Sequence, residues 1–300
     1  MAYKAQVYAT AKNEGYFWPH FAAHYRNLGI IHFIVLDDGS TDGSLDWLAG
    51  QPDVTVYRSN LGFADKLGKL RFGIAARGQL ARHFCAERWA LIADLDEFWL
   101  PPPEFDGFSA LSASLDKRGH VLCRGIMLDC FPETLATIAH ASGSEAPHQV
   151  APWFEDISPV IWPAGQARVA SYHPERNVRM RIASMLAQQG LLSPQQVKAR
   201  GCPTLYKAPL AKWLPSISMA SAHALHATYN NAHQMVCAHY KFVPTWTSKV
   251  EGAITSKSYY NASIEYEMLA LAKEHLTDTP LLGPSSKQFA LANLHNTLLF

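Results

Sequence analysis

The sequence predicts an α/β protein with a mostly parallel central sheet. Short apolar, β-rich runs alternate with amphipathic stretches through the first hundred residues, which is typical of successive strand–helix units. Two of these apolar runs end directly in aspartate-rich segments. Of the 300 residues, 48% are hydrophobic, which is enough for one large or two small cores.

The individual elements follow from hydrophobic periodicity. In the first hundred residues, we expect strands at 5–11, 32–36, 54–57 and 89–93, and helices at 17–28 and 66–85. Pro101, Pro102 and Pro103 then end the regular pattern.

The pattern is looser beyond these prolines. A helix is expected at 109–117 and a strand at 120–124, followed by a loop rich in Gly, Pro and His at 132–152. Apolar residues at i, i+3 and i+4 predict further helices at 245–255, 259–275 and 285–298. We interpret residues 1–245 as one domain and residues 246–300 as a helical C-terminal extension packed on it.

Composition excludes several functional classes. The formal charge is +1, from 26 Lys and Arg against 25 Asp and Glu, and the sequence has no basic tract, so we expect no nucleic-acid partner. No apolar run reaches about 18 residues, and charged residues interrupt the first apolar stretch, so we expect a cytoplasmic protein. The five cysteines are scattered without a C-x-x-C pair, which predicts small buried thiols.

The first acidic motif is Asp94-Leu95-Asp96, directly after a predicted strand. Alternation along an extended chain would place both carboxylates on the same side of the strand end. Two hard oxygen ligands suit Mg²⁺ or Mn²⁺, and such an ion would neutralise charge on a nucleotide diphosphate. Acidic residues at strand ends are also common where they are simply solvated.

The second acidic motif runs from Asp37 to Gly43, at the end of another predicted strand. Ligands of open α/β sheets bind at the carboxyl ends of the strands. Asp37 or Asp38 could accept hydrogen bonds from a base or a ribose there. An ordinary turn, in which Thr41 or Asp42 caps the next helix, explains the same residues without a ligand. We therefore expect the two acidic motifs to lie at one edge of the sheet.

The order of these motifs resembles a known family. Lys12-Asn13-Glu14 follows the first strand, a helix from Trp18 to Leu28 carries His24, and the Asp37–Gly43 and Asp94–Phe98 segments come next. In this order the chain resembles nucleotide-diphospho-sugar transferases of glycosyltransferase family 2, especially a bacterial subgroup related to family 92. Later segments match that subgroup's landmarks: Leu128–Phe131, Pro152–Asp156, Lys207–Leu210 with Trp213, His223–Leu225 and His239–Phe242.

The resemblance implies a GT-A type three-layer nucleotide-binding fold, with residues 1–245 as the catalytic domain. It implies transfer of a sugar, with inversion, from a nucleotide-diphosphate donor for which UDP is our default. It also implies Mn²⁺ or Mg²⁺ held by Asp94 and Asp96, with His239 as a further ligand. The residues that it implies for donor binding are Thr10, Lys12, Glu14, Asp37, Asp38, Asp94 and Lys241.

An inverting transferase needs a base that deprotonates the acceptor hydroxyl. Members of the family often place this carboxylate in an acidic pair well after the metal motif. Glu155-Asp156 could fill that role and Asp129 is a rival, although an ordinary loop carboxylate explains each equally well.

The expected partners are the nucleotide-sugar donor and a glycan or lipid-linked acceptor. The apolar segment 289–300 could contact the inner membrane face or a second subunit of a homodimer, although we favour its packing on the catalytic domain. Two other functions share this design. A nucleotidyltransferase would show a glycine-rich basic loop after the first strand, where Thr10 to Gly15 has one lysine and one glycine. A non-catalytic nucleotide-sugar or carbohydrate-binding protein would have no need for the two aspartates at 94 and 96.

Overall fold

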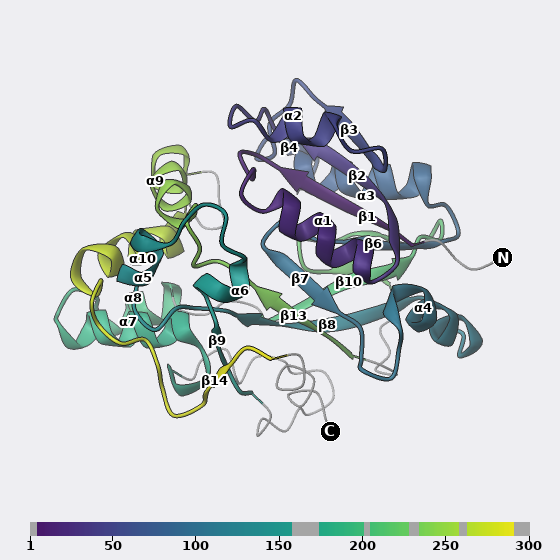
Figure 1. Cartoon of the computed structure of the whole chain (residues 1–300). Helices are drawn as coiled ribbons and strands as arrows, with labels where there is room; N and C mark the ends of the chain where they lie inside the picture. The colour runs from purple at the N-terminus through teal and green to yellow at the C-terminus, as the bar shows by residue number, and fades with distance from the viewer. Residues whose placement is uncertain (1–4, 158–173, 201–204, 228–233, 258–262, 291–300) are drawn as a thin grey trace. The chain divides into compact units, whose positions relative to one another are not determined.

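The computed structural model describes residues 5–157, 174–200, 205–227, 234–257 and 263–290 (Figure 1). The chain divides into two compact units. The first unit comprises residues 1–127 and 206–237, and the second comprises residues 128–205 and 238–300. The boundary predicted after residue 245 falls inside the second unit, and the division into a catalytic domain and an extension stays a prediction.

An eight-stranded sheet has the strand order β3-β2-β1-β6-β10-β8-β13-β7. The first four of these strands run parallel to one another, whereas β10 is antiparallel to both β6 and β8. The predicted α/β fold with a mostly parallel sheet is confirmed. The strand bounds are β1 Ala5–Ala11, β2 Ile30–Asp37, β3 Val54–Arg58, β6 Trp89–Ile92, β7 Glu97–Leu100, β8 Leu122–Asp129, β10 Tyr206–Lys212 and β13 Gln234–His239.

Helices cover both faces of the parallel part of this sheet. Phe33 and Ile34 are neighbours on β2, so their side chains point to opposite faces. Phe33 lies against Phe21 of α1 (Trp18–Asn27), with ring centroids 6.2 Å apart, whereas Ile34 shares a core with Ile74 of α3 (Phe72–Phe84). Helix, sheet and helix therefore form three layers, with α1 and α3 on either side of the strands (Figure 1).

The remaining elements of the first unit are short. They are α2 (Ser44–Ala49), the hairpin of β4 (Lys66–Leu67) and β5 (Leu70–Arg71), α4 (Gly107–Lys117), and the hairpin of β11 (Ser218–Met219) and β12 (Leu225–His226). The helix predicted at 66–85 is wrong over its first six residues, which form the β4–β5 hairpin. Gly68 has φ of +63° at this turn, a left-handed conformation that interrupts a right-handed helix.

The second unit is mainly helical. Its elements are α5 (Ala136–His140), α6 (Pro147–Val150), β9 (Trp153–Glu155), a 3₁₀ turn (Pro174–Arg176), α7 (Val178–Gln188), α8 (Pro194–Arg200), α9 (Trp246–Ser256), α10 (Ile264–His275) and β14 (Ser286–Gln288). Apolar residues of α7, α9 and α10 form its core, including Leu186, Val250 and Leu269. The passage at 132–152, predicted as a loop, contains α5 and α6.

The helix predicted at 285–298 is wrong over its described residues. Residues 286–288 form β14, which pairs antiparallel with β9, and the Phe289 N–H donates to the Pro152 carbonyl. The open edge of β9 offers backbone partners that compete with helical hydrogen bonds. Residues 291–298 lie outside the described part of the chain.

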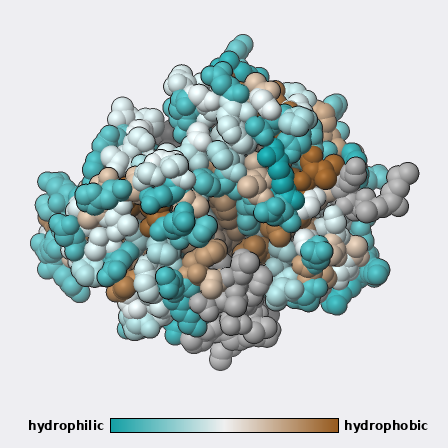
Figure 2. Space-filling model, viewed as in Figure 1, coloured by the Kyte–Doolittle hydropathy of each residue, from teal (hydrophilic) through white to brown (hydrophobic). Residues whose placement is uncertain are grey.

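Most large apolar side chains are buried. Among the described residues, Ile31, Leu61 and Leu67 are the large hydrophobic residues that are 43% to 50% exposed. The face shown in Figure 2 is accordingly mostly hydrophilic, with hydrophobic atoms in small, separate areas. Within the described ranges, we find no helix whose length and hydropathy would allow it to cross a membrane.

Candidate functional site

The two acidic motifs of the first unit leave the sheet at the same edge. Strand β1 lies between β2 and β6 and is parallel to both, with Ala11 opposite Asp37 and Tyr8 opposite Ile92. The N–H of Ala93 donates to the Tyr8 carbonyl at 3.2 Å, so the chain leaves β6 beside β1. The Asp37 and Asp94 segments therefore both follow carboxyl ends of adjacent parallel strands, as the sequence predicts.

Asp94 begins a turn. The N–H of Glu97 donates to the Asp94 carbonyl at 3.0 Å, and Leu95 and Asp96 occupy the two central turn positions. Because the chain is not extended here, the argument from alternation for Asp94 and Asp96 does not apply. The turn, and not the pleat of a strand, sets the directions of these two carboxylates.

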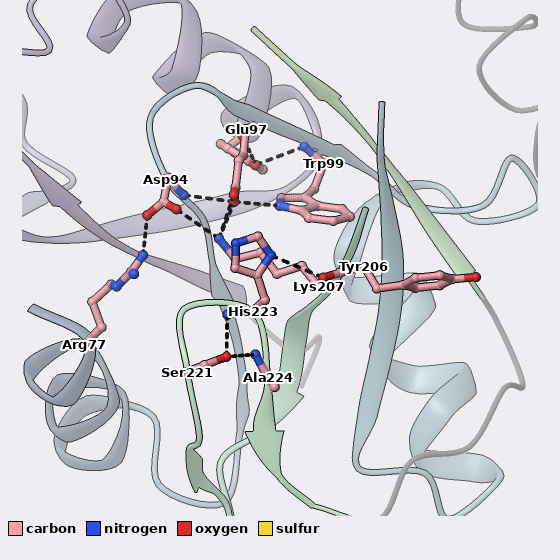
Figure 3. Close-up of polar contacts among 10 residues, drawn as sticks. Arg77, Asp94, Glu97, Trp99, Tyr206, Lys207, Ser221, His223 and Ala224 are labelled. Carbon is pink, nitrogen blue, oxygen red and sulfur yellow. Dashed lines mark hydrogen bonds and ion pairs between the residues drawn. The ribbon is translucent and has the colours of Figure 1, made fainter. Parts of the chain in front are cut away.

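The Asp94 carboxylate lies between two cations (Figure 3). Its Oδ1 accepts from Arg77 Nη1 at 2.5 Å, and its Oδ2 accepts from Lys207 Nζ at 3.1 Å. Burial alone would raise the pKa of Asp94, but the charges of Arg77 and Lys207 outweigh it and hold the pKa below its usual value. The Asp94 side chain is 37% exposed, so part of this ionised group still faces solvent.

Glu97 is the second carboxylate that Lys207 contacts. Lys207 Nζ lies 2.7 and 2.6 Å from the two Glu97 oxygens, and both side chains are buried. Glu97 Oε2 also accepts from the Asp94 N–H at 3.1 Å and from Trp99 Nε1 at 3.2 Å. Glu97 and Lys207 therefore fix the backbone of the Asp94 turn (Figure 3).

Arg77 reaches the turn from α3. Its side chain is 1% exposed, and Phe63 places its ring centroid 5.9 Å from the guanidinium carbon. Nη1 is bonded to Asp94, whereas Nε and Nη2 have no hydrogen-bond partner among the described residues. Buried donors of this kind normally find an acceptor, which can be a water or a ligand.

Sequence reasoning missed Arg77, gave Glu97 no role in the site, and named Lys207 only as part of a landmark of the family. A lysine directly before the apolar residues Ala208–Ala211 of β10 was one available indication, because an unpaired buried lysine is rare. Arg77 stands on the buried face of α3, where an arginine is equally unexpected. Neither pattern identifies the partner, since residues 77, 94 and 207 meet only in the folded chain.

His223 lies near this group in Figure 3. The ring Nδ1 of His223 is 3.3 Å from the Tyr206 carbonyl, and the backbone N–H of His223 donates to Ser221 Oγ at 3.1 Å. The hairpin that follows β10 therefore brings an imidazole next to the strand that carries Lys207.

Asp37 is part of the architecture of the second acidic motif. Its buried carboxylate accepts from the N–H groups of Gly39 and Ser40, each at 3.1 Å, and pairs with Arg58 at 3.2 Å. Gly39 has φ of +82°, so the tight turn depends on a glycine. Asp37 thus holds the loop in shape.

Asp38 points to the neighbouring segments. Its Oδ1 accepts from the Phe63 N–H at 2.7 Å, and its Oδ2 lies 3.8 Å from Lys12 Nζ. Its side chain is 15% exposed, against 1% for Asp37. Of this pair, Asp38 is therefore the residue better placed for a ligand.

The other predicted donor-binding residues of the first unit lie at the end of β1. Thr10 Oγ1 is buried without a hydrogen-bond partner in the described ranges. The Lys12 side chain is 59% exposed and Glu14 is half-buried. Asn13 Oδ1 accepts from the Thr41 N–H at 2.7 Å, which ties this segment to the acidic loop.

The second unit has a charged cluster of its own. Asp129 pairs with Arg179 at 2.6 Å and with His239 Nδ1 at 2.6 Å, and all three side chains are buried. Glu265 bridges Arg179 at 3.0 Å and Lys241 at 3.2 Å. Lys241 Nζ also lies 5.2 Å from the centre of the Tyr266 ring. Two predicted site residues, Asp129 and His239, are thus in direct contact.

Glu155 and Asp156 contact the C-terminal segment. Glu155 Oε1 pairs with Arg181 at 2.5 Å, and its Oε2 accepts from Ser285 Oγ at 2.7 Å. Asp156 forms an ion pair with Lys287. Both candidate bases therefore already have polar partners on or beside β14.

In the described ranges, no three His, Cys, Asp or Glu side chains are arranged to hold a metal ion. At the Asp94 turn, three carboxylates (Asp94, Asp96 and Glu97) stand against two cations (Arg77 and Lys207), which leaves a formal charge of −1 on these five groups. Carboxylate oxygens are the class of ligand that Mn²⁺ and Mg²⁺ prefer in proteins. A separate hollow of about 530 Å³ in the first unit is lined by other residues, including Leu214, Ile217 and His226.

No family model matches the sequence, and no curated protein matches it. Among solved structures, the chain is similar to a crystal structure of UDP-glucose pyrophosphorylase in complex with UDP-glucose. The match covers 51% of this chain and 66% of that chain, just under two thirds, with 9% sequence identity and a TM-score of 0.23. A likeness at this level carries no argument about activity.

Proposed function

We propose that the protein is a glycosyltransferase that takes a sugar from a nucleotide-diphosphate donor, by default a UDP-sugar, and passes it to a glycan or lipid-linked acceptor with inversion. The observation that carries the proposal is the placement of two acidic loops at the carboxyl ends of β2 and β6, on either side of β1. This edge is where nucleotides bind to open α/β sheets.

The roles in the first unit follow from exposure and contacts. Asp37 shapes its loop, and the partly exposed Asp38 accepts hydrogen bonds from the nucleoside. A divalent cation held by Asp96 and Asp94 would neutralise negative charge on the diphosphate as the sugar leaves. Arg77 and Lys207 keep Asp94 ionised, and Glu97 keeps the turn in place.

Donor binding is the first test. We expect one nucleoside diphosphate to raise the melting temperature only when Mn²⁺ or Mg²⁺ is present, because a ligand at 100 times its dissociation constant adds about 2.7 kcal/mol to the free energy of unfolding. Stabilisation by the same nucleotide without a metal would contradict the metal requirement. The absence of stabilisation by any nucleotide would contradict the proposal itself.

Asp96 is the residue to change. We expect Asp96→Asn to fold normally and to lose both metal-dependent nucleotide binding and sugar transfer, since the variant removes one ionised ligand and no volume. Asp116→Asn is the control, because Asp116 pairs with Lys212 at the surface of the same unit. Normal transfer by a folded Asp96→Asn variant would refute the role of Asp96.

The reaction products distinguish a glycosyltransferase from the two other candidate functions. Formation of a nucleotide sugar from a nucleoside triphosphate and a sugar phosphate would identify a nucleotidyltransferase. Metal-dependent donor binding without transfer or hydrolysis would identify a non-catalytic binding protein.

A further inference from the structure

The hairpin of β4 and β5 follows β3 at the carboxyl edge of the sheet. The last residue of β3 pairs with Asp37, and the Phe63 N–H, which comes before the hairpin, donates to Asp38 Oδ1 at 2.7 Å. The Phe72 N–H closes the base of the hairpin by donating to the Asp65 carbonyl at 2.6 Å. The hairpin is therefore fixed to the loop that carries Asp38.

Three cations stand on this short hairpin. Lys66 and Arg71 are directly opposite each other in the antiparallel pair, and Lys69 follows Gly68 in the turn. Among the described residues, none of the three cations forms an ion pair with a carboxylate. Like charges that face each other across two strands repel and destabilise the pairing. The hairpin thus carries a repulsion that the described part of the protein does not neutralise.

Positive charge is concentrated in this part of the chain. Residues 58–71 contain four Lys and Arg side chains and one carboxylate, which gives a formal charge of +3, against +1 for the whole chain. The carboxylate is that of Asp65, and its Oδ2 already accepts from the Gly62 N–H at 2.8 Å. Lys66 and Lys69 are exposed and Arg71 is half-buried, so these cations can meet an anionic partner.

The same hairpin presents an apolar side chain to solvent. Leu70 packs on the core of the first unit, whereas Leu67, its partner across the hairpin, is 50% exposed. Leu61, shortly before the hairpin, is 45% exposed. A small soluble anion would leave both leucines in water. Cations beside exposed leucine side chains suit the surface of an anionic bilayer, where lipid phosphates lie next to apolar chains.

We propose that the β4–β5 hairpin is a membrane-contact surface for anionic lipids. Lys66, Lys69 and Arg71 meet the lipid phosphates, and Leu67 enters the boundary between headgroups and acyl chains. This surface does not involve the segment 289–300. The inference rests on the hairpin alone, although a bilayer at this edge of the sheet would bring a lipid-linked acceptor close to the Asp38 loop.

Sedimentation with lipid vesicles is the first measurement. We expect the unmodified protein to bind vesicles of phosphatidylcholine and phosphatidylglycerol and to leave vesicles of phosphatidylcholine alone unbound. High salt should weaken this binding, because it screens the attraction between exposed charges. In Lys66→Gln/Lys69→Gln we expect binding weakened by about 25-fold, since each cation near an anionic surface contributes about fivefold.

Two further variants separate the hairpin from net charge and from its own leucine. Lys117→Gln/Arg118→Gln is the matched control, because it removes two exposed cations from the C-terminal end of α4 in the same unit. We expect this control to bind vesicles as the unmodified protein does. Leu67→Ser keeps every charge and should weaken binding by about fivefold, since about half of the leucine side chain is available for burial.

Equal vesicle binding by Lys66→Gln/Lys69→Gln and by the α4 control would overturn the inference, as would equal binding to the two kinds of vesicle. Binding of inorganic pyrophosphate that is lost in the hairpin variant, without vesicle binding, would also overturn it and assign the cations to a small anion. The hairpin variant should melt no lower than the unmodified protein, because Lys66→Gln relieves the repulsion from Arg71.

A separate readout distinguishes this inference from the proposed function. Metal-dependent stabilisation by a nucleoside diphosphate, measured without lipid, should be the same in the hairpin variant and in the unmodified protein. Its absence from both would refute the proposed function and leave the vesicle result standing. Its loss in the hairpin variant alone would assign these cations to the donor site and overturn the membrane contact.

Discussion

His24 predicts a specific loss of stability in acid. It stands on α1, and its Nε2 lies 2.9 Å from the Trp99 carbonyl, with the Phe98 ring centroid 5.1 Å away. Burial lowers the pKa of His24 from 6.5 to about 4, and the hydrogen bond to Trp99 opposes this only in part. The unfolded chain therefore binds a proton near pH 6.5, which the folded protein accepts only near pH 4.

The free energy of unfolding must then fall as the pH drops from 6.5 to 4, because the unfolded state gains the proton first. The difference between 6.5 and about 4, at about 1.4 kcal/mol per pKa unit, gives a full loss of about 3 kcal/mol. The side chain keeps some contact with solvent, so we expect about 2 kcal/mol.

His24→Gln isolates this effect, because the glutamine amide can still donate to Trp99 and does not titrate. Urea unfolding followed by tryptophan fluorescence, at several pH values from 7 to 4, measures the free energy for both proteins. We expect the difference between variant and unmodified protein to shift by about 2 kcal/mol in favour of the variant as the pH falls. Parallel pH dependence of the two proteins would refute the assignment of a depressed pKa to His24.

Two further predictions concern packing and charge. A methyl group at Gly125 would overlap the buried ring of Trp99, so Gly125→Ala should lower the free energy of urea unfolding by about 1–3 kcal/mol. Gly252 is the control, because it lies on the exposed face of α9 with open space around it. Gly252→Ala should raise the free energy of unfolding by up to about 1 kcal/mol. Equal effects of the two substitutions would contradict the packing around Trp99. Lys207→Met should lower the free energy of unfolding by about 3–5 kcal/mol, because it leaves Glu97 buried without its cation. The double variant Lys207→Met/Glu97→Gln should recover part of this loss. Additive effects of the two substitutions would refute the pairing.

Local periodicity predicted the parallel half of the sheet well. The bounds of β1 agree with the prediction, and β2, β3 and β6 differ from it by no more than two residues at either end. These strands alternate with helices that bury one face, so each element shows its own period in the sequence. The position of both acidic motifs at the carboxyl edge followed from this order alone.

The other strands and the contacts of the candidate site depended on pairing between segments that are distant in the sequence. Strand β10 joins the sheet beside β6, although more than a hundred residues separate them, and β14 forms only because β9 offers an edge. Residues 285–298 have helical spacing of their apolar residues, yet tertiary hydrogen bonds decide the conformation of residues 286–288. The contacts of Lys207 with Asp94 and Glu97, like that of His239 with Asp129, arise from the same distant pairings.

Asp94 and Asp129 have a common arrangement that bears on how candidate residues should be chosen. Each aspartate lies at or just after the end of a strand, and each pairs with a buried arginine from a helix, Arg77 on α3 or Arg179 on α7. Because arginine stays charged at every physiological pH, each aspartate is held ionised and in a fixed orientation. A sequence motif identifies such aspartates by position, but their chemistry depends on the arginine. Asp96 lies in the turn that Asp94 begins, and His239 contacts Asp129 through Nδ1. A change in ligand binding should therefore be sought first at Asp96 and His239.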